Sequence, residues 1–497
     1  MELSEFSRKY IEILDNASLK YDRLLWWSTL LGARNRFYDP TLELQKLILD
    51  PALGETSRKQ PTFLRRLARL SDSVCLLLLA LFKKMLLVGK SIPVADTEYY
   101  TIVKTHSYDH SFKNGQFIDP FLGALTEKIQ SEKQAIVITE HLGHYFKSLP
   151  KIRTVNNVFN IYQFLKAKDL LWVLGIMLKN FFKRPQSSNN NILQLVDDNF
   201  RLEICSKWVA HNLILYRAFR NIFNSYQSKY IHTLYENTNW EKVLIWAKNG
   251  SSSTAKVIAH QHVPISESAL NYFPGASEAK LVSPDFIITT GETPAMILRR
   301  NLPISGDRIK VGCGIRFHSR EILKSSTSVK AILAALDGTS NARPVLNFLY
   351  ENRKTIASHG WTVIVRFHPI FDLSQMKNFI KFDLCRDTNW EVSTKDLSSD
   401  LARSSLLAYW GSTVSFEAVS CGLPVVCVKG LSEILSNDPL WGVECLKWSV
   451  SEADDIDSIL SHLESYDHAK NQRNSNPDLS QYFEEMTDQT LTRFFDL

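Results

Sequence analysis

Short apolar runs, each followed by a polar or glycine-containing turn and then by helical spacing, recur through most of the chain. Runs of four to eight apolar residues bounded by turn residues are typical of buried parallel strands. Because segments with helical spacing separate them, the pattern predicts an α/β protein built from doubly wound sheets. We expect strands at 102–105, 135–139, 230–234, 256–260, 285–289, 309–313, 329–336, 362–365, 406–409 and 425–428.

Changes in this pattern predict the domain organisation. Residues 1–95 have mostly helical spacing, and they join the strands that follow in a first Rossmann-like domain that runs from 1 to 312. A second Rossmann-like domain is expected at 313–478, and its first strand is the run at 329–336. Residues 479–497 are expected to form a last helix that packs back onto the protein.

The stretch 406–428 contains a complete strand, turn, helix and strand unit. The turn Gly411-Ser412-Thr413 follows the first strand, and helical spacing begins at Val414. Hydroxyls and free N–H groups at the start of a helix, at the carboxyl edge of a parallel sheet, are suited to binding an anion. A plain N-cap role for Ser412 or Thr413 is an equally good interpretation of this stretch alone.

Other polar groups follow neighbouring strands of the second domain. Arg366, His368 and Pro369 come directly after the strand at 362–365, and Asp337-Gly338 follows the strand at 329–336 in a turn able to present N–H groups. Since the carboxyl ends of parallel strands share one edge, these groups should line the same crevice as Ser412. A cation, an imidazole and two hydroxyls in one crevice favour a nucleotide phosphate.

The first domain also places ionisable groups after its strands. Asp109 and Asp119 lie in the loop that follows the strand at 102–105, Glu236 follows 230–234, and His262 follows 256–260. Most such groups are merely solvated, so each is a candidate only. His141 and His144 lack a carboxylate or third histidine at a fixed offset, and we therefore expect no metal site.

Composition excludes several classes of protein. A net charge of +6 is mildly basic, fits anionic substrates or an anionic membrane surface, and is too small to indicate a nucleic-acid partner. The seven cysteines form no CxxC pair, which indicates a reducing compartment. The chain opens without a secretory signal pattern, and we expect a cytoplasmic protein.

Two segments have the composition of a helix that lies on a membrane surface. The segment 161–184 is amphipathic and basic and is the better candidate for such a helix, with a core helix as the alternative. The segment 61–90 combines arginines, an apolar stretch and two lysines, and for it a buried helix is the preferred interpretation. Peripheral association with the inner membrane is therefore an expectation that rests mainly on 161–184.

Two motifs of the second domain resemble those of a known family. RFHP at 366–369 and GSTVSFEA at 411–418 resemble the His-Pro motif and the paired-hydroxyl motif of bacterial GT-B glycosyltransferases that use CMP-activated nonulosonic acids, such as sialic, Kdo, legionaminic and pseudaminic acid. The resemblance implies that His368, Ser412, Thr413 and Ser415 contact CMP. This chain has Ser-Thr-Val-Ser in place of a Ser-Ser pair, so the assignment among the three hydroxyls stays open.

The first domain resembles a group of bacterial surface-carbohydrate biosynthesis proteins. The stretches that carry this resemblance are WWSTLLGARN, FIDPFLGAL, YENTNWEK and AHQH. It implies transfer of a nonulosonic acid from its CMP-activated donor to a surface polysaccharide, in capsule or lipopolysaccharide, or to a lipid-linked precursor, without a metal or other cofactor. The fold so implied is GT-B, with two doubly wound Rossmann-like domains, a helical N-terminal addition and a C-terminal helix that crosses back.

The implied reaction assigns roles to the candidate residues. Glu236 is expected to act as base or, if the reaction retains configuration, as nucleophile, with Asp109 and Asp119 as rivals. His262 would contact the sugar carboxylate, and Arg366 would assist at the phosphate. Glu417, one helical turn past Thr413, would reach the ribose, with packing or solvation as an equal alternative.

Two further functions share these motifs. A CDP-glycerol-type polyol-phosphate transferase also carries an RxHP motif and a hydroxyl motif. A non-catalytic protein that binds sugar nucleotides for assembly is the third interpretation, and it predicts that no donor is hydrolysed.

Overall fold

The computed structural model describes residues 2–35, 39–50, 62–87, 90, 100–182, 190–315, 329–338, 343–368, 389–431, 433–465 and 479–495. The chain forms two compact units. Unit 1 comprises residues 1–263, 270–318 and 480–497, and unit 2 comprises residues 264–269 and 319–479. Each unit contains one large parallel sheet, so the expected fold class, two Rossmann-like α/β domains in one chain, is confirmed.

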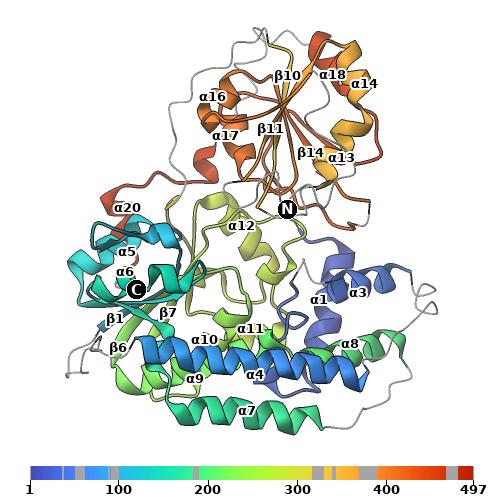
Figure 1. Ribbon diagram of the computed structural model, residues 1–497. Coiled ribbons are helices and arrows are strands. Elements are labelled where there is room, and N and C mark those ends of the chain that lie inside the picture. Colours follow the sequence, from blue (N-terminus) through green and yellow to red (C-terminus); the bar gives the residue numbers. More distant parts are fainter. Residues whose placement is uncertain are drawn as a thin grey trace. The chain divides into compact units, whose positions relative to one another are not determined.

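The sheet of unit 1 has seven strands in the order β5-β4-β1-β6-β7-β8-β9, and every neighbouring pair is parallel (Figure 1). The chain starts at β1, moves outward to β5, and then returns to the other side of β1 with β6. This is the strand order of a Rossmann fold, and the order reverses between β1 and β6. The strands are β1 (Tyr100–Ser107), β4 (Ala135–His141), β5 (Val158–Asn160), β6 (Ser228–Leu234), β7 (Lys256–His260), β8 (Phe286–Thr289) and β9 (Ile309–Val311).

Helices connect and cover these strands, because a parallel crossover needs a dozen or more residues. A small hairpin of β2 (Phe112–Lys113) and β3 (Gln116–Phe117) lies in the loop after β1. The connecting helices are α5 (Ala124–Glu132), α6 (Tyr145–Thr154), α7 (Ala167–Phe181), α8 (Asn191–Glu203), α9 (Lys207–Ser225), α10 (Asn239–Asn249), α11 (Ala276–Val282) and α12 (Glu292–Asn301).

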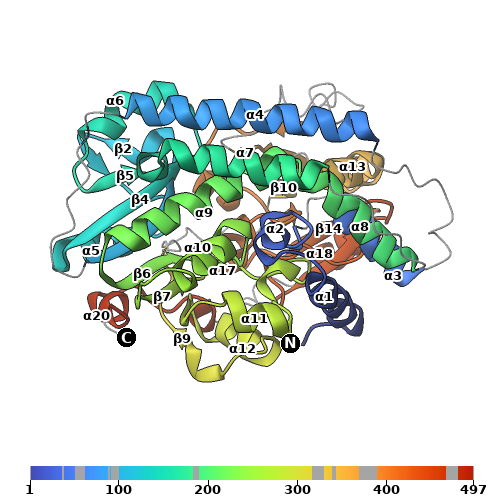
Figure 2. The ribbon, with the colours of Figure 1, turned by 90° about the horizontal axis from the view of Figure 1, so that it is seen from below.

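The described part of residues 1–95 is helical, as the apolar spacing predicts. It forms α1 (Glu5–Ser18), α2 (Arg23–Ser28), α3 (Asp39–Leu49) and the long α4 (Phe63–Leu86). Helix α4 contacts α7, α8 and α9, and it runs beside α7 in both views (Figures 1 and 2). Among the described residues, no helix is long and apolar enough to cross a membrane.

The sheet of unit 2 has six parallel strands in the order β12-β11-β10-β13-β14-β15, again a Rossmann order. The order reverses between β10 and β13. The strands are β10 (Ala331–Ala335), β11 (Thr362–Arg366), β12 (Trp390–Val392), β13 (Leu406–Tyr409), β14 (Val425–Lys429) and β15 (Lys447–Ser451). The helices include α13 (Arg343–Glu351), α14 (Arg353–Ser358), α16 (Leu397–Ala402), α17 (Val414–Ser420) and α18 (Asp457–Ser465).

The C-terminal segment departs from the expectation of one helix over 479–497. Residues 480–497 do belong to unit 1, but the helix α20 covers only Asp488–Thr492. The Glu484 N–H donates to the carbonyl of Thr290, and the Gly314 N–H donates to the carbonyl of Glu484. Because these backbone groups pair with other parts of unit 1, the segment before α20 cannot close the hydrogen bonds of a helix.

Candidate functional site

The two sheets each have a point where the strand order reverses, and open α/β sheets bind ligands outside the carboxyl ends of the strands at such points. In unit 1 this point lies between β1 and β6, and in unit 2 between β10 and β13. We call these two regions the unit 1 switch edge and the unit 2 switch edge. Arg366 is the last residue of β11, and the other described candidates lie on loops or helices that follow these strands or their neighbours.

Glu236 and His262 meet at the unit 1 switch edge. Glu236 follows β6 and His262 follows β7, and these strands pair so that Leu234 lies opposite His260. His262 Nε2 lies 3.3 Å from Glu236 Oε1. The imidazole is fully buried, whereas the Glu236 carboxylate is 34% exposed. A solvent-reachable carboxylate with an imidazole behind it is the arrangement of an oriented general base.

The loop that carries Glu236 is fixed by hydrogen bonds to its backbone. The Glu241 carboxylate accepts from the N–H groups of Glu236 and Asn237, at 3.0 and 2.6 Å. The Asn271 amide donates to the Glu236 carbonyl at 2.5 Å. Burial, with the nearby charge of Glu236, raises the pKa of Glu241 to about 8. Glu241 therefore holds the loop, and of these two carboxylates Glu236 is the one that reaches solvent.

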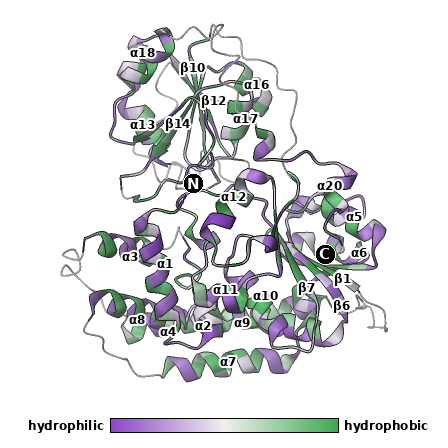
Figure 3. Ribbon diagram, turned by 180° about the vertical axis from the view of Figure 1, so that it is seen from behind, coloured by the Kyte–Doolittle hydropathy of each residue, from purple (hydrophilic) through white to green (hydrophobic). Residues whose placement is uncertain are grey.

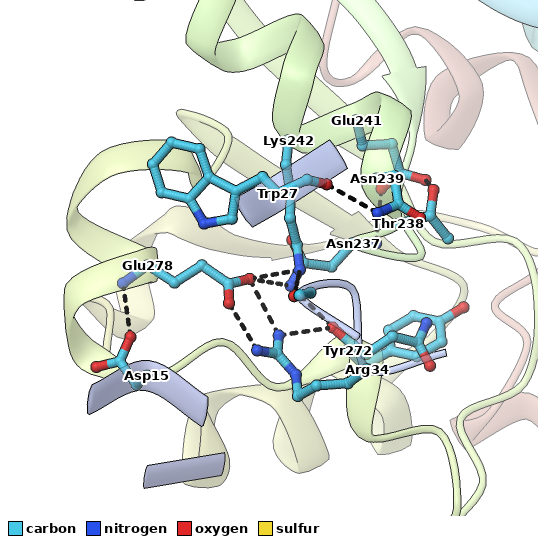
Figure 4. Close-up of polar contacts among 12 residues, drawn as sticks. Asp15, Trp27, Arg34, Asn237, Thr238, Asn239, Glu241, Lys242, Tyr272 and Glu278 are labelled. Carbon is cyan, nitrogen blue, oxygen red and sulfur yellow. Dashed lines mark hydrogen bonds and ion pairs between the residues drawn. The ribbon is translucent and has the colours of Figure 1, made fainter. Parts of the chain in front are cut away.

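A buried ion-pair network lies behind this loop (Figure 4). The Glu278 carboxylate binds the Arg34 guanidinium at 2.6 and 3.0 Å and the Lys242 ammonium at 2.9 Å. It also accepts from the Asn237 amide at 3.0 Å, and Asn237 has a positive φ of 54°. The network thus joins the WWSTLLGARN stretch, which contains Arg34, to the YENTNWEK stretch, which contains Asn237 and Lys242. Both stretches therefore help to position the Glu236 loop.

Asp109 lies in a chain of polar groups after β1. Its Oδ1 is 2.9 Å from His141 Nε2 and accepts from the Ser148 hydroxyl at 2.7 Å. The hydrogen bond from Ser148 is the main cause that lowers the pKa of Asp109. The other ring nitrogen of His141 lies 3.2 Å from the hydroxyl of Ser107, which is fully buried. Asp109 therefore stays ionised and, 36% exposed with the buried His141 imidazole beside it, forms the same kind of pair as Glu236 and His262.

The Asp119 carboxylate is held by hydrogen bonds from its own loop, from β1 and from α5. Its carboxylate accepts from the Thr105 and Thr126 hydroxyls and from the N–H groups of Phe121 and Leu122, at 2.7 to 3.0 Å. The residue is 5% exposed. Four hydrogen bonds in a buried setting favour a structural role, so the structure ranks Asp119 below its rival Glu236 as the reacting carboxylate.

The sequence pattern missed a buried cluster beside the unit 1 switch edge. Glu140, at the end of β4, lies 2.8 Å from His211 Nε2 on α9 and 3.7 Å from His106 Nδ1 on β1. Burial by itself would raise the pKa of Glu140, but His211, His106 and Lys104 lower it below its usual range. Glu140 stands directly before His141 at a strand end, which is a usable signal, whereas His211 sits within a helix and gives none. Within the described part of the chain, no group of three or more His, Cys, Asp or Glu is arranged to hold a metal ion.

Acid should destabilise the protein through two buried histidines. Burial next to Lys104 lowers the pKa of His106 to about 3, and burial next to His232 lowers the pKa of His260 well below 6.5. Below pH 6.5 these histidines are protonated in the unfolded chain but stay neutral in the native protein. The two histidines therefore lower the free energy of unfolding as the pH decreases. Each histidine should cost about 2 kcal/mol between pH 7.5 and pH 5, whereas Glu241, whose pKa is raised to about 8, adds stability over the same range as the native protein takes up its proton. In urea titrations, His106→Gln should therefore lose less free energy of unfolding than the parent protein between these two pH values. An identical pH dependence in the two proteins would contradict this expectation.

In unit 2, the predicted phosphate-binding turns flank the strand-order reversal. Asp337 and Gly338 follow β10, and Gly411, Ser412 and Thr413 follow β13. These strands pair directly, with Ala335 opposite Tyr409. The structure therefore brings the two turns to one edge, as the sequence pattern predicts.

The turn after β13 requires its glycine. Gly411 has a φ of 66°, and a Cβ there would lie 2.1 Å from the amide nitrogen of Asn437. Thr413 is exposed and makes no side-chain capping hydrogen bond, so the plain N-cap interpretation does not describe its hydroxyl. Ser412 is 7% exposed. Ser415 is fully buried and donates to the Ser412 carbonyl at 2.9 Å, which favours a structural role among the three hydroxyl residues.

The described residues of the RFHP stretch differ in their surroundings. The Arg366 guanidinium pairs with the fully buried Asp400 carboxylate at 2.8 Å and donates to the Lys395 carbonyl. This pairing compensates its charge and weakens the expected role as a helper at the phosphate. His368 lies exposed at the carboxyl end of β11, Glu417 lies half-buried on α17, and Pro369 lies outside the described residues.

Comparisons with known proteins give structural similarities only. No protein-family model and no curated protein matches the sequence. Similar solved structures include a UDP-N-acetylglucosamine 2-epimerase from Rickettsia bellii, with 11% identity, a TM-score of 0.44 and coverage of 77% of this chain and 92% of that one. A glycosyltransferase from Rickettsia africae has 12% identity and a TM-score of 0.39, with 80% and 94% covered.

An α,α-trehalose-phosphate synthase (UDP-forming) from Burkholderia vietnamiensis has 10% identity and a TM-score of 0.40, with 76% and 94% covered. Glycosyltransferases and a sugar-nucleotide epimerase are therefore among the proteins to which this chain is similar. Because identities are this low and TM-scores lie below 0.5, the functional conclusions below rest on the residues of this chain and not on these proteins.

Proposed function

We propose that the protein is a glycosyltransferase that moves a nonulosonic acid from a CMP-activated donor to a surface polysaccharide or its lipid-linked precursor in the cytoplasm. The nucleotide binds at the unit 2 switch edge, where Ser412, Thr413 and His368 contact its phosphate or base. Glu236, supported by His262, acts on the acceptor. The reaction needs no metal or other cofactor, since CMP leaves as a phosphate monoester.

One observation carries the proposal: the two turns singled out for phosphate binding follow β10 and β13, the neighbouring strands at which the order of the unit 2 sheet reverses. Ligands of open α/β sheets bind at this place. The exposed Thr413 hydroxyl and the exposed His368 imidazole give the edge the donors that a phosphate accepts. The RFHP and GSTVSFEA stretches supply the preference for CMP.

The proposed chemistry balances with the residues of unit 1. The bond between the anomeric carbon and the phosphate oxygen breaks, and CMP leaves with the electron pair. The acceptor oxygen forms the new bond to the anomeric carbon, and its proton passes to Glu236 Oε1 or Oε2. If the configuration is retained, Glu236 first bonds to or pairs with the anomeric carbon as CMP leaves. The acceptor oxygen then displaces Glu236, and the released carboxylate takes up the acceptor proton. His262 orients the carboxylate.

Thermal-shift measurements with CMP, CDP and UDP test the donor. We expect CMP to raise the melting temperature most. Thr413→Val should abolish that rise without lowering the melting temperature of the free protein, because the Thr413 hydroxyl makes no capping bond. Thr362→Val, an exposed threonine at the start of β11, serves as the matched control and should keep the CMP response.

The alternatives give different results in the same experiment. A CDP-glycerol-type polyol-phosphate transferase should respond most to CDP. A non-catalytic binding protein should respond to a nucleotide but release no CMP from any CMP-sugar during a long incubation. A largest response to UDP would contradict the choice of CMP.

A further inference from the structure

Helix α4 leaves most of its apolar side chains uncovered. Of its 24 residues, only Leu70, Ser73, Leu77 and Ala80 are buried, and they form a narrow stripe toward the protein. A helix that belongs to a core buries a wider apolar face. The large exposed apolar residues of α4 are Phe63, Leu64, Leu67, Val74, Leu78, Leu79, Phe82 and Met85. The expectation of a buried helix for 61–90 is therefore wrong for the described part, α4.

Helix α7 continues this surface. Its exposed apolar residues, Leu171 and Leu178, together with Phe182 just after it, are spaced by seven and four positions and so share one helical face. The start of α4 contacts the end of α7, because the Phe63 and Phe181 rings lie 5.4 Å apart and Arg66 lies 5.0 Å above the Phe181 ring. At the other end, Lys84 donates to the Leu165 carbonyl just before α7. The two helices are therefore antiparallel neighbours over their length (Figure 2).

Helix α6 extends the surface at the end of α4. Its Phe146 is 54% exposed, and the Phe146 and Phe82 rings lie 5.9 Å apart. We call the exposed apolar residues of α4, α6 and α7, with Phe182, the helical face. In Figure 3, apolar residues recur along both α4 and α7. Large contiguous apolar surface on a folded protein marks a contact with a partner or a membrane.

The charges on the helices of the helical face indicate which kind of partner it binds. Of the cationic side chains on or next to these helices, some contact the protein itself: Arg66, Arg69, Lys84 and Arg153 donate to backbone carbonyls, and Lys83 lies over the Tyr145 and Tyr162 rings. Other exposed cations are Arg65, Lys147, Lys151, Lys166, Lys168 and Lys179. The carboxylates within α4, α6 and α7 are Asp72 and Asp169, and Asp169 is buried against Arg217 at 2.6 Å. Apolar side chains ringed by cations complement a bilayer with anionic headgroups, since the former enter the acyl boundary and the latter pair with phosphates.

We infer that the helical face docks on the surface of a bilayer that contains anionic phospholipid, and that α4 and α7 lie in the plane of its interface together. The segments 61–90 and 161–184, which the sequence indicates as separate candidates, thus contribute to one membrane contact. It holds whether or not the protein transfers a nonulosonic acid, because lipid binding requires no donor or acceptor.

Sedimentation with vesicles tests the inference on the full chain. We expect the protein to bind vesicles of phosphatidylcholine and phosphatidylglycerol at about 3:1, and to bind pure phosphatidylcholine at least about tenfold more weakly. Raising the salt to about 0.5 M should release it by a similar factor, because salt screens the cations. Failure of the protein to bind the anionic vesicles would overturn the inference.

A matched pair of double variants assigns the contact to the helical face. Leu78→Glu with Leu171→Glu places two charges on residues that are 63% and 70% exposed, so folding should be kept. We expect binding to fall at least about tenfold, since a carboxylate opposes both apolar insertion and anionic lipid. Met296→Glu with Leu431→Glu makes the same charge change at exposed residues elsewhere and should keep binding within about twofold.

Two results would contradict the assignment. Equal losses in the two variants would show that net charge alone decides binding. A concentration-dependent dimer that Leu78→Glu with Leu171→Glu dissociates, in a protein that does not bind vesicles, would show that a second copy of the chain covers the face. Melting temperatures of both variants check that each is folded.

Discussion

Glu236→Gln is expected to lower kcat by about 10³-fold while donor binding stays within a few fold of the parent protein. Glutamine keeps the size of the side chain but cannot accept the acceptor proton or carry negative charge toward the anomeric carbon. The loop should not move, because the bonds that fix it join the Glu241 carboxylate and the Asn271 amide to the backbone N–H and carbonyl of Glu236. Release of CMP from a CMP-nonulosonate, with and without acceptor, measures the effect.

Asp109→Asn and Asp119→Asn provide the comparison for Glu236→Gln. Asp109 orients His141, and Asp119 accepts four hydrogen bonds, so both changes should act mainly on stability. A kcat within a few fold of the parent for Glu236→Gln, with CMP still bound, would remove Glu236 from the reaction. A larger loss in Asp109→Asn at an unchanged melting temperature would transfer the role to that carboxylate.

The central strands of both sheets were predictable because they are buried on both sides. All ten expected strand ranges overlap observed strands, and runs such as Leu406–Tyr409 and Ala135–His141 are buried at every position. The missed strands β5, β12 and β15 lie at the sheet edges. β5 and β12 have three residues each, and β15 is half-exposed with polar residues at alternate positions, so neither length nor apolar content marks them.

The position of the candidate site in the fold could be predicted from the same strands. The hydrogen-bond and ion-pair partners of its side chains could not. Parallel strands bring their carboxyl ends to one edge, so Glu236 and His262, or Asp337 and Ser412, could be grouped from the sequence. The partners that occupy Arg366 and Glu140 lie 34 and 71 residues away along the chain, at Asp400 and His211. Such pairs depend on how helices pack on the sheet, and no local pattern encodes them.

The second large effect is expected at Glu278, on stability rather than on chemistry. The Glu278 carboxylate compensates Arg34 and Lys242, whose side chains are 1% and 0% exposed. Burial would raise the pKa of Glu278, but Arg34 and Lys242 lower it to about 2, so the carboxylate is ionised at neutral pH. The stability that this ionisation contributes is complete above pH 4.5 and is lost as the pH falls toward 2.

Glu278→Gln should therefore lower the free energy of unfolding by about 3–5 kcal/mol at pH 7, measured by urea titration. Glutamine can still accept from the Asn237 amide, so the loss reports the two uncompensated cations and not the Asn237 contact. Glu292→Gln is the matched control, because the Arg299–Glu292 pair is also close, at 2.7 Å, but is 34% and 41% exposed and should contribute less than about 1 kcal/mol. Equal losses in the two variants would mean that the network behind the Glu236 loop is no more stabilising than a surface ion pair. A large loss confined to Glu278→Gln would instead show that the WWSTLLGARN and YENTNWEK stretches act together as one buried support.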